Sequence, residues 1–151
     1  MTSLDDLKAA CKRLGLEWRE NQRQHRWWGE SVGDTPLPEG FTAAELGHCE
    51  HAIGIPNDLQ THECFDGKTS RNIPGAYEVG VVRRRDGKPG YTLMLDSIHG
   101  GYGLEAIAGA NCSKLKQAYA TEVAKRQAIK QGFRVQERKL HNGATQLVLS
   151  K

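Results

Sequence analysis

The sequence predicts an α+β fold, a two-layer sandwich in which a mostly antiparallel sheet built of hairpins carries an N-terminal helix and one long helix on one face. Apolar residues recur at three- and four-residue spacing in 4–14 and 104–131, which is typical of amphipathic helices. Two apolar runs, 76–83 and 91–98, flank a loop rich in charge and Gly and indicate a β-hairpin. The pair Asn142-Gly143 indicates a second hairpin. Because hairpins dominate, the sheet is expected to be antiparallel, with the helices covering one face.

The N-terminal helix has both of its ends marked in the sequence. Ser3 is a favourable N-cap, and Asp6 lies in the first turn, where a negative charge meets the positive end of the helix dipole. Gly15 predicts the end of the helix, because glycine readily adopts the left-handed conformation found there. The next segment, 16–20, is predicted to be a short strand, with 25–28 as its hairpin partner.

The middle of the chain alternates loops with short elements. Residues 29–40 carry three Gly and two Pro and are predicted to form a loop. Thr42 and Glu45 have the spacing of a capping box, so a single helical turn is expected there. Residues 49–55 are predicted to form a strand.

The second half adds an insertion, the long helix and the closing hairpin. The polar stretch 57–75, broken by Gly and Pro, is predicted to be a loop-rich insertion. An interruption of the long helix is expected near 109–111, and Gly132 is expected to end it. The strands 133–138 and 144–150 then close the fold.

Length and composition bound the class of protein. The 151 residues are expected to form one domain, 1–151, and the 38% hydrophobic and 26% charged residues exclude an intrinsically disordered chain. No run approaches the roughly 18 apolar residues of a membrane-spanning helix, and the first residues are too polar for a signal peptide. We therefore expect no membrane association and a cytoplasmic location. The net charge of +3 does not by itself indicate a nucleic-acid partner, and four scattered cysteines disfavour a disulfide framework.

Several segments carry a resemblance to a known family. They are Cys49–Pro56, Ala76–Gly80, Gly103–Glu105, Leu115–Ala120, Gly132–Glu137, the Asn142-Gly143 turn and Leu147–Leu149. In this combination, over roughly residues 45–150, the chain resembles a family of uncharacterised small proteins, a domain of unknown function, encoded in plastid, cyanobacterial and phage genomes. Some members look to be encoded near an AAA-type ATPase, so the resemblance implies an accessory role with such an ATPase as partner. If the chain is phage-encoded, the implied partner is a host protein.

One cluster of His and Cys has the residue types of a zinc site. Alternate residues of a strand share a face, so Cys49 is expected to point the same way as His51, and His62 the same way as Cys64. If the two segments pair, these four side chains converge in an arrangement suited to tetrahedral zinc. The spacing differs from common zinc motifs, so the alternative is a structural role for the cluster. Beyond this zinc, no cofactor is expected.

Positive and negative charges gather in different parts of the chain. Residues 114–139 hold eight Lys or Arg and two Glu, whereas 39–66 hold six acidic residues and no Lys or Arg. A basic helix beside a basic strand is suited to following phosphates. The sequence therefore raises nucleic-acid binding as an alternative function, while the other interpretation is that these cations only solvate an outer face. The candidate residues are Arg83, Arg84, Arg85, Arg134, Arg138 and Lys139.

A protein-contact surface is also predicted. Adjacent residues of a strand face opposite sides, so one of Trp27 and Trp28 is expected in the core and the other at the surface or beneath a loop. A surface Trp beside Arg is a common composition of protein interfaces. Arg126 and Lys130 continue the apolar stripe of the long helix, so either the helix overhangs the sheet or these cations meet an acidic partner.

No arrangement in the sequence indicates a catalytic site. There is no HExxH motif, and no Gly-Lys-Ser/Thr follows the glycine cluster Gly100–Gly103. The sequence favours a non-enzymatic module that binds a protein partner as an accessory or regulatory factor. Nucleic-acid binding and zinc binding are the alternatives, and self-association into a homo-oligomer is left open.

Overall fold

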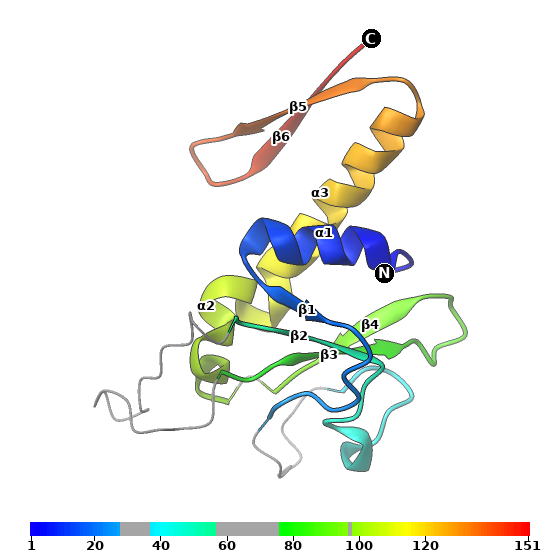
Figure 1. Ribbon diagram of the computed structural model, residues 1–151, viewed down its shortest axis with the longest axis vertical. Helices are drawn as coiled ribbons and strands as arrows, with labels where there is room; N and C mark the ends of the chain where they lie inside the picture. Colours follow the sequence, from blue (N-terminus) through cyan, green and yellow to red (C-terminus); the bar gives the residue numbers. More distant parts are fainter. Residues whose placement is uncertain (28–36, 57–75, 97) are drawn as a thin grey trace.

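The computed structural model describes residues 1–27, 37–56, 76–96 and 98–151, and it confirms the α+β class (Figure 1). The predicted insertion 57–75 and most of the predicted loop 29–40 lie outside the described residues. Short 3₁₀ helices are labelled η. The elements are, in chain order, α1 (Leu4–Leu14), β1 (Glu17–Arg19), η1 (Ala43–Glu45), β2 (His51–Gly54), β3 (Val79–Arg83), β4 (Tyr91–Met94), η3 (Ile98–Gly103), α2 (Leu104–Ala108), η4 (Ala110–Cys112), α3 (Ser113–Lys130), β5 (Arg134–Lys139) and β6 (Thr145–Ser150).

Four strands form one antiparallel sheet in the order β1-β2-β3-β4. Trp18 lies opposite Ile53, Ile53 lies opposite Val79, and Val81 lies opposite Leu93. Strands that follow one another along the described chain are therefore neighbours in the sheet, as hairpin-dominated connectivity predicts.

The predicted hairpin between 16–20 and 25–28 is wrong. β1 pairs with β2, and the segment after β1 makes a single isolated bridge, between Gln24 and His48. The chain turns at Asn21, which has a φ of 57°. His25 is buried after this turn, so the segment that follows β1 packs against the sheet and does not form a hairpin with β1.

α1 and α3 cover one face of the sheet, as predicted (Figure 1). The hydroxyl of Ser3 accepts a hydrogen bond from the Asp6 N–H at 3.1 Å, and Gly15 ends α1 with a φ of 75°. The core between the layers joins α1, the sheet and the two later helices into one apolar cluster, whose burial is the main source of stability. Its larger members are Leu7, Cys11, Ile53, Val79, Val81, Leu93, Leu104, Cys112 and Leu115.

The opposite face of the sheet is also covered. A second cluster packs there beneath the segment that contains η1, and it consists of Leu46, Cys49, Ala52, Val82 and Met94 with Trp27, Leu37 and Phe41 at its margin. The predicted capping box at Thr42 and Glu45 is present in η1. Because both faces are covered, all four residues of β2 are buried.

The long helix is bent where the sequence predicts an interruption. Gly109, Asn111 and Cys112 have φ values of 82°, 50° and 58°, which separate α2 from α3. A Cβ atom at Gly109 would lie 2.6 Å from the backbone nitrogen of Lys114, so the bend requires glycine there.

The closing hairpin forms a sheet of its own. β5 and β6 pair over six residues each, from Arg134 opposite Ser150 to Lys139 opposite Thr145. The hairpin rests on the end of α3, away from the four-stranded sheet (Figure 1). We call residues 125–151, the end of α3 with β5 and β6, the C-terminal arm.

An ionic cluster ties the C-terminal arm to α1. The Arg13 guanidinium donates to Glu122 on α3 at 2.7 Å and to Glu137 on β5 at 2.7 Å. Lys125 reaches the same Glu137 carboxylate at 2.8 Å. These bonds hold the pKa of Glu137 at about 2, chiefly through the hydrogen bond from Arg13. A two-stranded hairpin is marginally stable by itself, so contacts of this kind help to hold it against the helices.

A buried carboxylate fastens the turn after β1 to the sheet. Glu78 is 3% exposed and accepts hydrogen bonds from the Arg19 guanidinium, from the Gln22 amide at 3.0 Å and from the Arg26 backbone N–H at 2.8 Å. The charge is therefore both paired and hydrogen-bonded, as burial of an ionised group requires.

Candidate functional site

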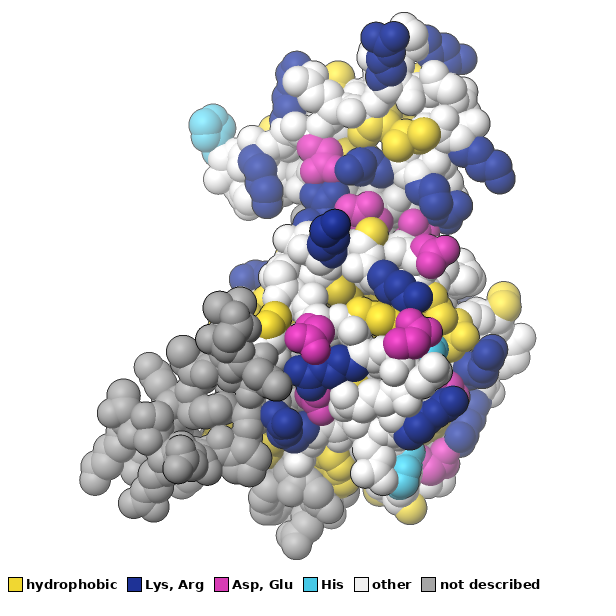
Figure 2. All heavy atoms as spheres, in the orientation of Figure 1, with side chains coloured by type: hydrophobic (Ala, Val, Ile, Leu, Met, Phe, Trp, Pro, Cys, Tyr) yellow, Lys and Arg dark blue, Asp and Glu magenta, His cyan; other side chains and the backbone are white. Residues whose placement is uncertain are grey.

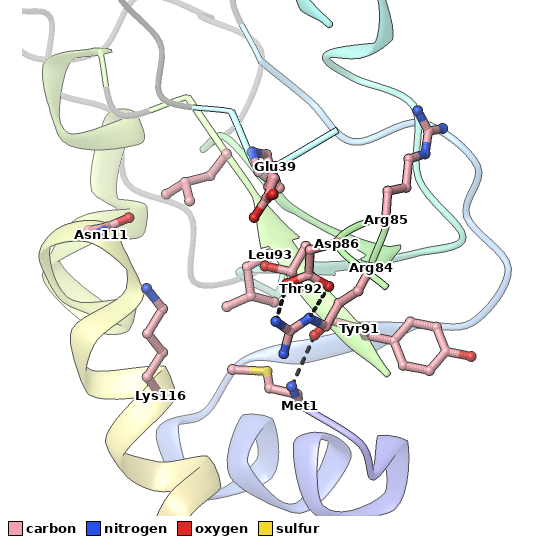
Figure 3. Close-up of a pocket in the computed structure, with 12 residues that line it drawn as sticks. Met1, Glu39, Arg84, Arg85, Asp86, Tyr91, Thr92, Leu93, Asn111 and Lys116 are labelled. Carbon is pink, nitrogen blue, oxygen red and sulfur yellow. Dashed lines mark hydrogen bonds and ion pairs between the residues drawn. The ribbon is translucent and has the colours of Figure 1, made fainter. Parts of the chain in front are cut away.

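A groove of about 370 Å³ opens along the outer edge of β4 (Figure 3). Segments that are far apart in the sequence line it: the chain start, a loop, the β3–β4 turn, β4 itself and the start of the α3 region. We call it the β4-edge groove, and its polar and apolar lining includes Met1, Glu39, Arg84, Asp86, Tyr91, Leu93, Leu95, Asn111 and Lys116.

β4 is the last strand of its sheet, so one side of its backbone has no neighbouring strand among the described residues. The Tyr91 N–H donates to the Met1 carbonyl at 2.7 Å, and the Tyr91 carbonyl accepts from the Met1 amine at 3.0 Å. Hydrogen-bonding direction alternates along an antiparallel strand, so Leu93 turns its N–H and C=O toward the same outer side. No described residue bonds to these two groups, although Leu93 is only 9% exposed. Within the described part of the chain, the floor of the groove therefore has a backbone donor and a backbone acceptor without partners.

Charged side chains surround that floor. Arg84 donates to both Asp86 oxygens, with Nε to Oδ1 at 3.1 Å, and this pairing lowers the pKa of Asp86 to about 2. Burial, followed by the nearby Arg84 charge, lowers the pKa of the Met1 amine. Figure 3 shows Lys116 reaching toward the groove from α3, opposite Arg84. Among the described residues, Lys116 makes no ion pair, so its charge is available to an anionic ligand.

A buried histidine lies on the other side of the sheet. His25 is 3% exposed, and neither of its ring nitrogens has a hydrogen-bond partner among the described residues. Its ring approaches Gly80 closely, where a Cβ atom would lie 3.1 Å from Nε2. Burial lowers the pKa of His25 to about 4, so the ring is neutral at pH 7.

The structure separates the two described residues of the predicted zinc cluster. Cys49 packs in the cluster with Ala52 and Val82, whereas His51 lies beside Trp18 on the helix-covered face, with ring centroids 5.1 Å apart. The expected shared face is therefore not found, because β2 begins only at His51 and strand alternation does not extend back to Cys49. The Cys49 thiol donates to the Gln22 carbonyl at 3.2 Å, and burial raises its pKa to about 11.

His62 and Cys64, the other two predicted ligands, lie outside the described residues. Within the described residues, no group of three or more His, Cys, Asp and Glu is placed to hold a metal ion. Zinc binding by the four-residue cluster stays a prediction.

The predicted protein-contact residues divide in a similar way. Trp27 is half-buried against the second apolar cluster, and Trp28 lies outside the described residues. Arg126 meets an acidic partner within the chain, since its guanidinium bonds Asp6 at 2.9 Å. Lys130 is exposed near the end of α3.

The predicted nucleic-acid residues lie on two separate surfaces. At the β3–β4 turn, Arg84 pairs with Asp86, and Arg85 pairs with Glu45 and lies 4.0 Å from the Phe41 ring centroid. Arg83 lies over Tyr91, at 5.2 Å. The other three candidates, Arg134, Arg138 and Lys139, are exposed on β5 in the C-terminal arm, and α1 lies between the two surfaces (Figure 1).

Sequence reasoning missed the residues that define the β4-edge groove. The sequence places Leu93 only in a hairpin, because the outer strand of a sheet cannot be identified until the strand order is known. Lys116 was counted only in the overall charge of the long helix.

Comparisons with protein-family models, with curated protein sequences and with solved structures give no match for this chain. The resemblance to the plastid, cyanobacterial and phage family thus stays a prediction. None of the described helices is long and apolar enough to cross a bilayer.

Proposed function

We propose that this protein is a non-enzymatic binding module that captures the extended C-terminal segment of a partner protein in the β4-edge groove. The observation that carries the proposal is that, among the described residues, neither the backbone of Leu93 nor the charge of Lys116 in the same groove has a partner. Strand addition to a free sheet edge is a recurrent mode of peptide recognition, in which main-chain hydrogen bonds supply affinity.

The direction of the peptide follows from the sheet. All described pairs of this sheet are antiparallel, so a peptide that continues the pattern runs from Leu95 toward Tyr91. At Tyr91 the backbone of Met1 already occupies the edge, so the added strand must end there. Its carboxylate then lies in the groove that Lys116 lines, and a cationic site favours the ionised form.

The proposed cellular role and the proposed partner rest on the sequence alone. An accessory or regulatory role in the cytoplasm suits a module of this kind, and the family resemblance supports an AAA-type ATPase or, for a phage-encoded chain, a host protein as the partner.

A display library of random octapeptides with free C-termini tests the proposal, with the wild-type protein and Lys116→Glu as baits. The matched control is Lys114→Glu, which makes the same charge change two residues away on α3, where the side chain instead reaches the Ala106 carbonyl. We expect wild type and the control to enrich peptides with β-branched residues near the C-terminus, and Lys116→Glu to lose them.

Synthetic peptides from that selection then separate the two parts of the recognition. Amidation of the C-terminus is expected to weaken binding at least tenfold, because it removes the charge that Lys116 meets. Binding is also expected to protect the Leu93 amide from hydrogen exchange. No enrichment, equal binding of amidated peptides, or an unprotected Leu93 amide would each refute the proposal.

A further inference from the structure

The C-terminal arm carries a strong excess of positive over negative charge. Residues 125–151 hold seven Lys or Arg and one acidic residue, a net charge of +6, whereas the whole chain has +3. Two of these cations are neutralised internally, Lys125 by Glu137 at 2.8 Å and Arg126 by Asp6 at 2.9 Å. Within the described part of the chain, the other five on the arm make no ion pair: Lys130, Arg134, Arg138, Lys139 and Lys151.

The register of the hairpin divides its side chains between two faces. Glu137 bonds to Arg13 and Lys125, so the face that includes Glu137 is turned toward the helices. Side chains alternate along a strand, and the opposite face is therefore turned outward. This outer face holds Arg134, Gln136 and Arg138 on β5, paired with Ser150, Val148 and Gln146 on β6. All six except the half-buried Val148 are exposed.

The outer face stands clear of the remainder of the described molecule. Figure 1 places β5 and β6 at the end of α3 that is farther from the four-stranded sheet, and Figure 2 shows Lys and Arg gathered over this part. The result is a two-stranded ribbon whose outward surface combines guanidinium and amide groups, with no acidic side chain among its six residues.

We propose that this ribbon inserts its outer face into the major groove of double-stranded DNA. The major groove of B-DNA is about 12 Å wide and admits a two-stranded β-ribbon. Alternate residues of a strand are about 6.8 Å apart, which is close to two base-pair steps of about 3.4 Å each. Arg134, Gln136 and Arg138 therefore reach base pairs spaced by two along the groove.

The side chains of the outer face have the chemistry that reads base edges. Arginine donates two hydrogen bonds to guanine O6 and N7, and glutamine pairs with adenine N6 and N7. Arg134 and Arg138 are accordingly assigned to guanine, and Gln136 and Gln146 to adenine. Lys130 is exposed at the end of α3, and Lys139, although it shares the face of Glu137, is exposed as the last residue of β5; both long side chains suit contacts to the phosphates.

Other nucleic acids fit this surface less well. The major groove of an RNA duplex is too deep and narrow for side chains to read. Single strands are usually bound by aromatic side chains on which bases stack, and the six outer residues include none. At the β3–β4 turn, Arg84 and Arg85 are already paired with carboxylates, which makes that turn a poorer site than the arm.

Fluorescence anisotropy with a labelled 20-base-pair DNA duplex containing guanine and adenine runs tests the inference. We expect micromolar binding at 50 mM salt that weakens about tenfold by 200 mM, as two phosphate contacts predict. Arg134→Gln/Arg138→Gln is expected to weaken binding at least tenfold. The matched control, Arg83→Gln/Lys88→Gln, removes two positive charges from the β3–β4 turn and is expected to change affinity less than threefold. All four residues are exposed, so both double variants are expected to fold, and thermal unfolding checks this.

Selection from duplexes with a random centre tests the base contacts separately. Gln136→Ala is expected to keep the salt dependence but to lose preference at one base pair. The inference is overturned if the wild type does not bind the duplex at 50 mM salt or if the arm variant matches the turn control. It is also overturned if duplex RNA or single-stranded DNA of the same length binds as tightly. This surface is separate from the β4-edge groove, so either proposal can fail without the other.

Discussion

Replacement of Glu78 by glutamine should destabilise the protein by about 3 kcal/mol. The carboxylate is 3% exposed and accepts bonds from Arg19, Gln22 and Arg26. Removing one partner of a buried ion pair costs about 3–5 kcal/mol, because the other charge is left without compensation. Glutamine keeps one oxygen that accepts from the Arg26 N–H, which places the expected loss at about 3 kcal/mol, the lower end of this range.

Thermal and urea unfolding measure this loss. For a chain of this size, about 3 kcal/mol corresponds to a fall in Tm of about 6–12 °C. The matched control is Glu17→Gln, which removes the same charge from a carboxylate that also bonds Arg19, at 3.3 Å, but is 50% exposed. Exposed pairs contribute about 0–1 kcal/mol, so the control should lower Tm by a few degrees at most.

A double-mutant cycle with Arg19→Met identifies the cause. In the absence of Arg19, Glu78→Gln no longer leaves a buried guanidinium without a partner. The double variant should therefore be more stable, by at least 1 kcal/mol, than the sum of the two single losses predicts. Additive losses, or a Glu78→Gln variant that loses no more free energy of unfolding than Glu17→Gln, would show that the reasoning is wrong.

Two further predictions concern a buried histidine and the attachment of the C-terminal arm. Burial lowers the pKa of His25 in the folded protein from 6.5 to about 4, so between these pH values the unfolded chain binds a proton that the folded protein does not. The free energy of unfolding therefore falls as the pH drops, by up to about 3 kcal/mol at pH 4. Urea unfolding from pH 7 to 4.5 should show this fall in wild type and in the exposed-site control His48→Gln but not in His25→Gln, and parallel curves for all three would contradict it. Arg13→Met should speed hydrogen exchange of the β5–β6 amides about fivefold, because partly exposed ion pairs contribute about 1 kcal/mol. The exposed Lys12→Met should leave exchange unchanged, and equal exchange in both variants would refute the role given to Arg13.

Features set by local chemistry could be predicted from the sequence. Ser3 and Gly15 mark the ends of α1 because capping depends on residues within one turn of each other. The bend at Gly109 is likewise local, since it follows from the conformational freedom of that glycine. Strand pairing is different: β1 pairs with β2 across a long separation, and the free energy that decides this comes from burial of both faces.

The candidate sites depend on that non-local arrangement. Whether Leu93 has a free backbone edge is decided by the strand order, which no segment specifies alone. For Arg126, the sequence allows either an overhanging helix or an acidic partner. The partner is Asp6 on α1, which comes close to Arg126 only when the two helices pack. For Cys49 and His51, the error came from applying strand alternation to a residue that lies before the strand begins.

The two proposed binding surfaces lie at opposite ends of one rigid element. Lys116 is near the start of α3 (Ser113–Lys130), and the ribbon follows its end, so the helix separates them by about 21 Å at a rise of about 1.5 Å per residue. Charges that far apart are screened from each other in physiological salt, where the Debye length is about 8 Å. Energetic effects at distant sites without shared partners are usually additive. A protein partner held in the β4-edge groove would therefore leave the ribbon free, and the helix would fix the distance between that partner and a bound duplex.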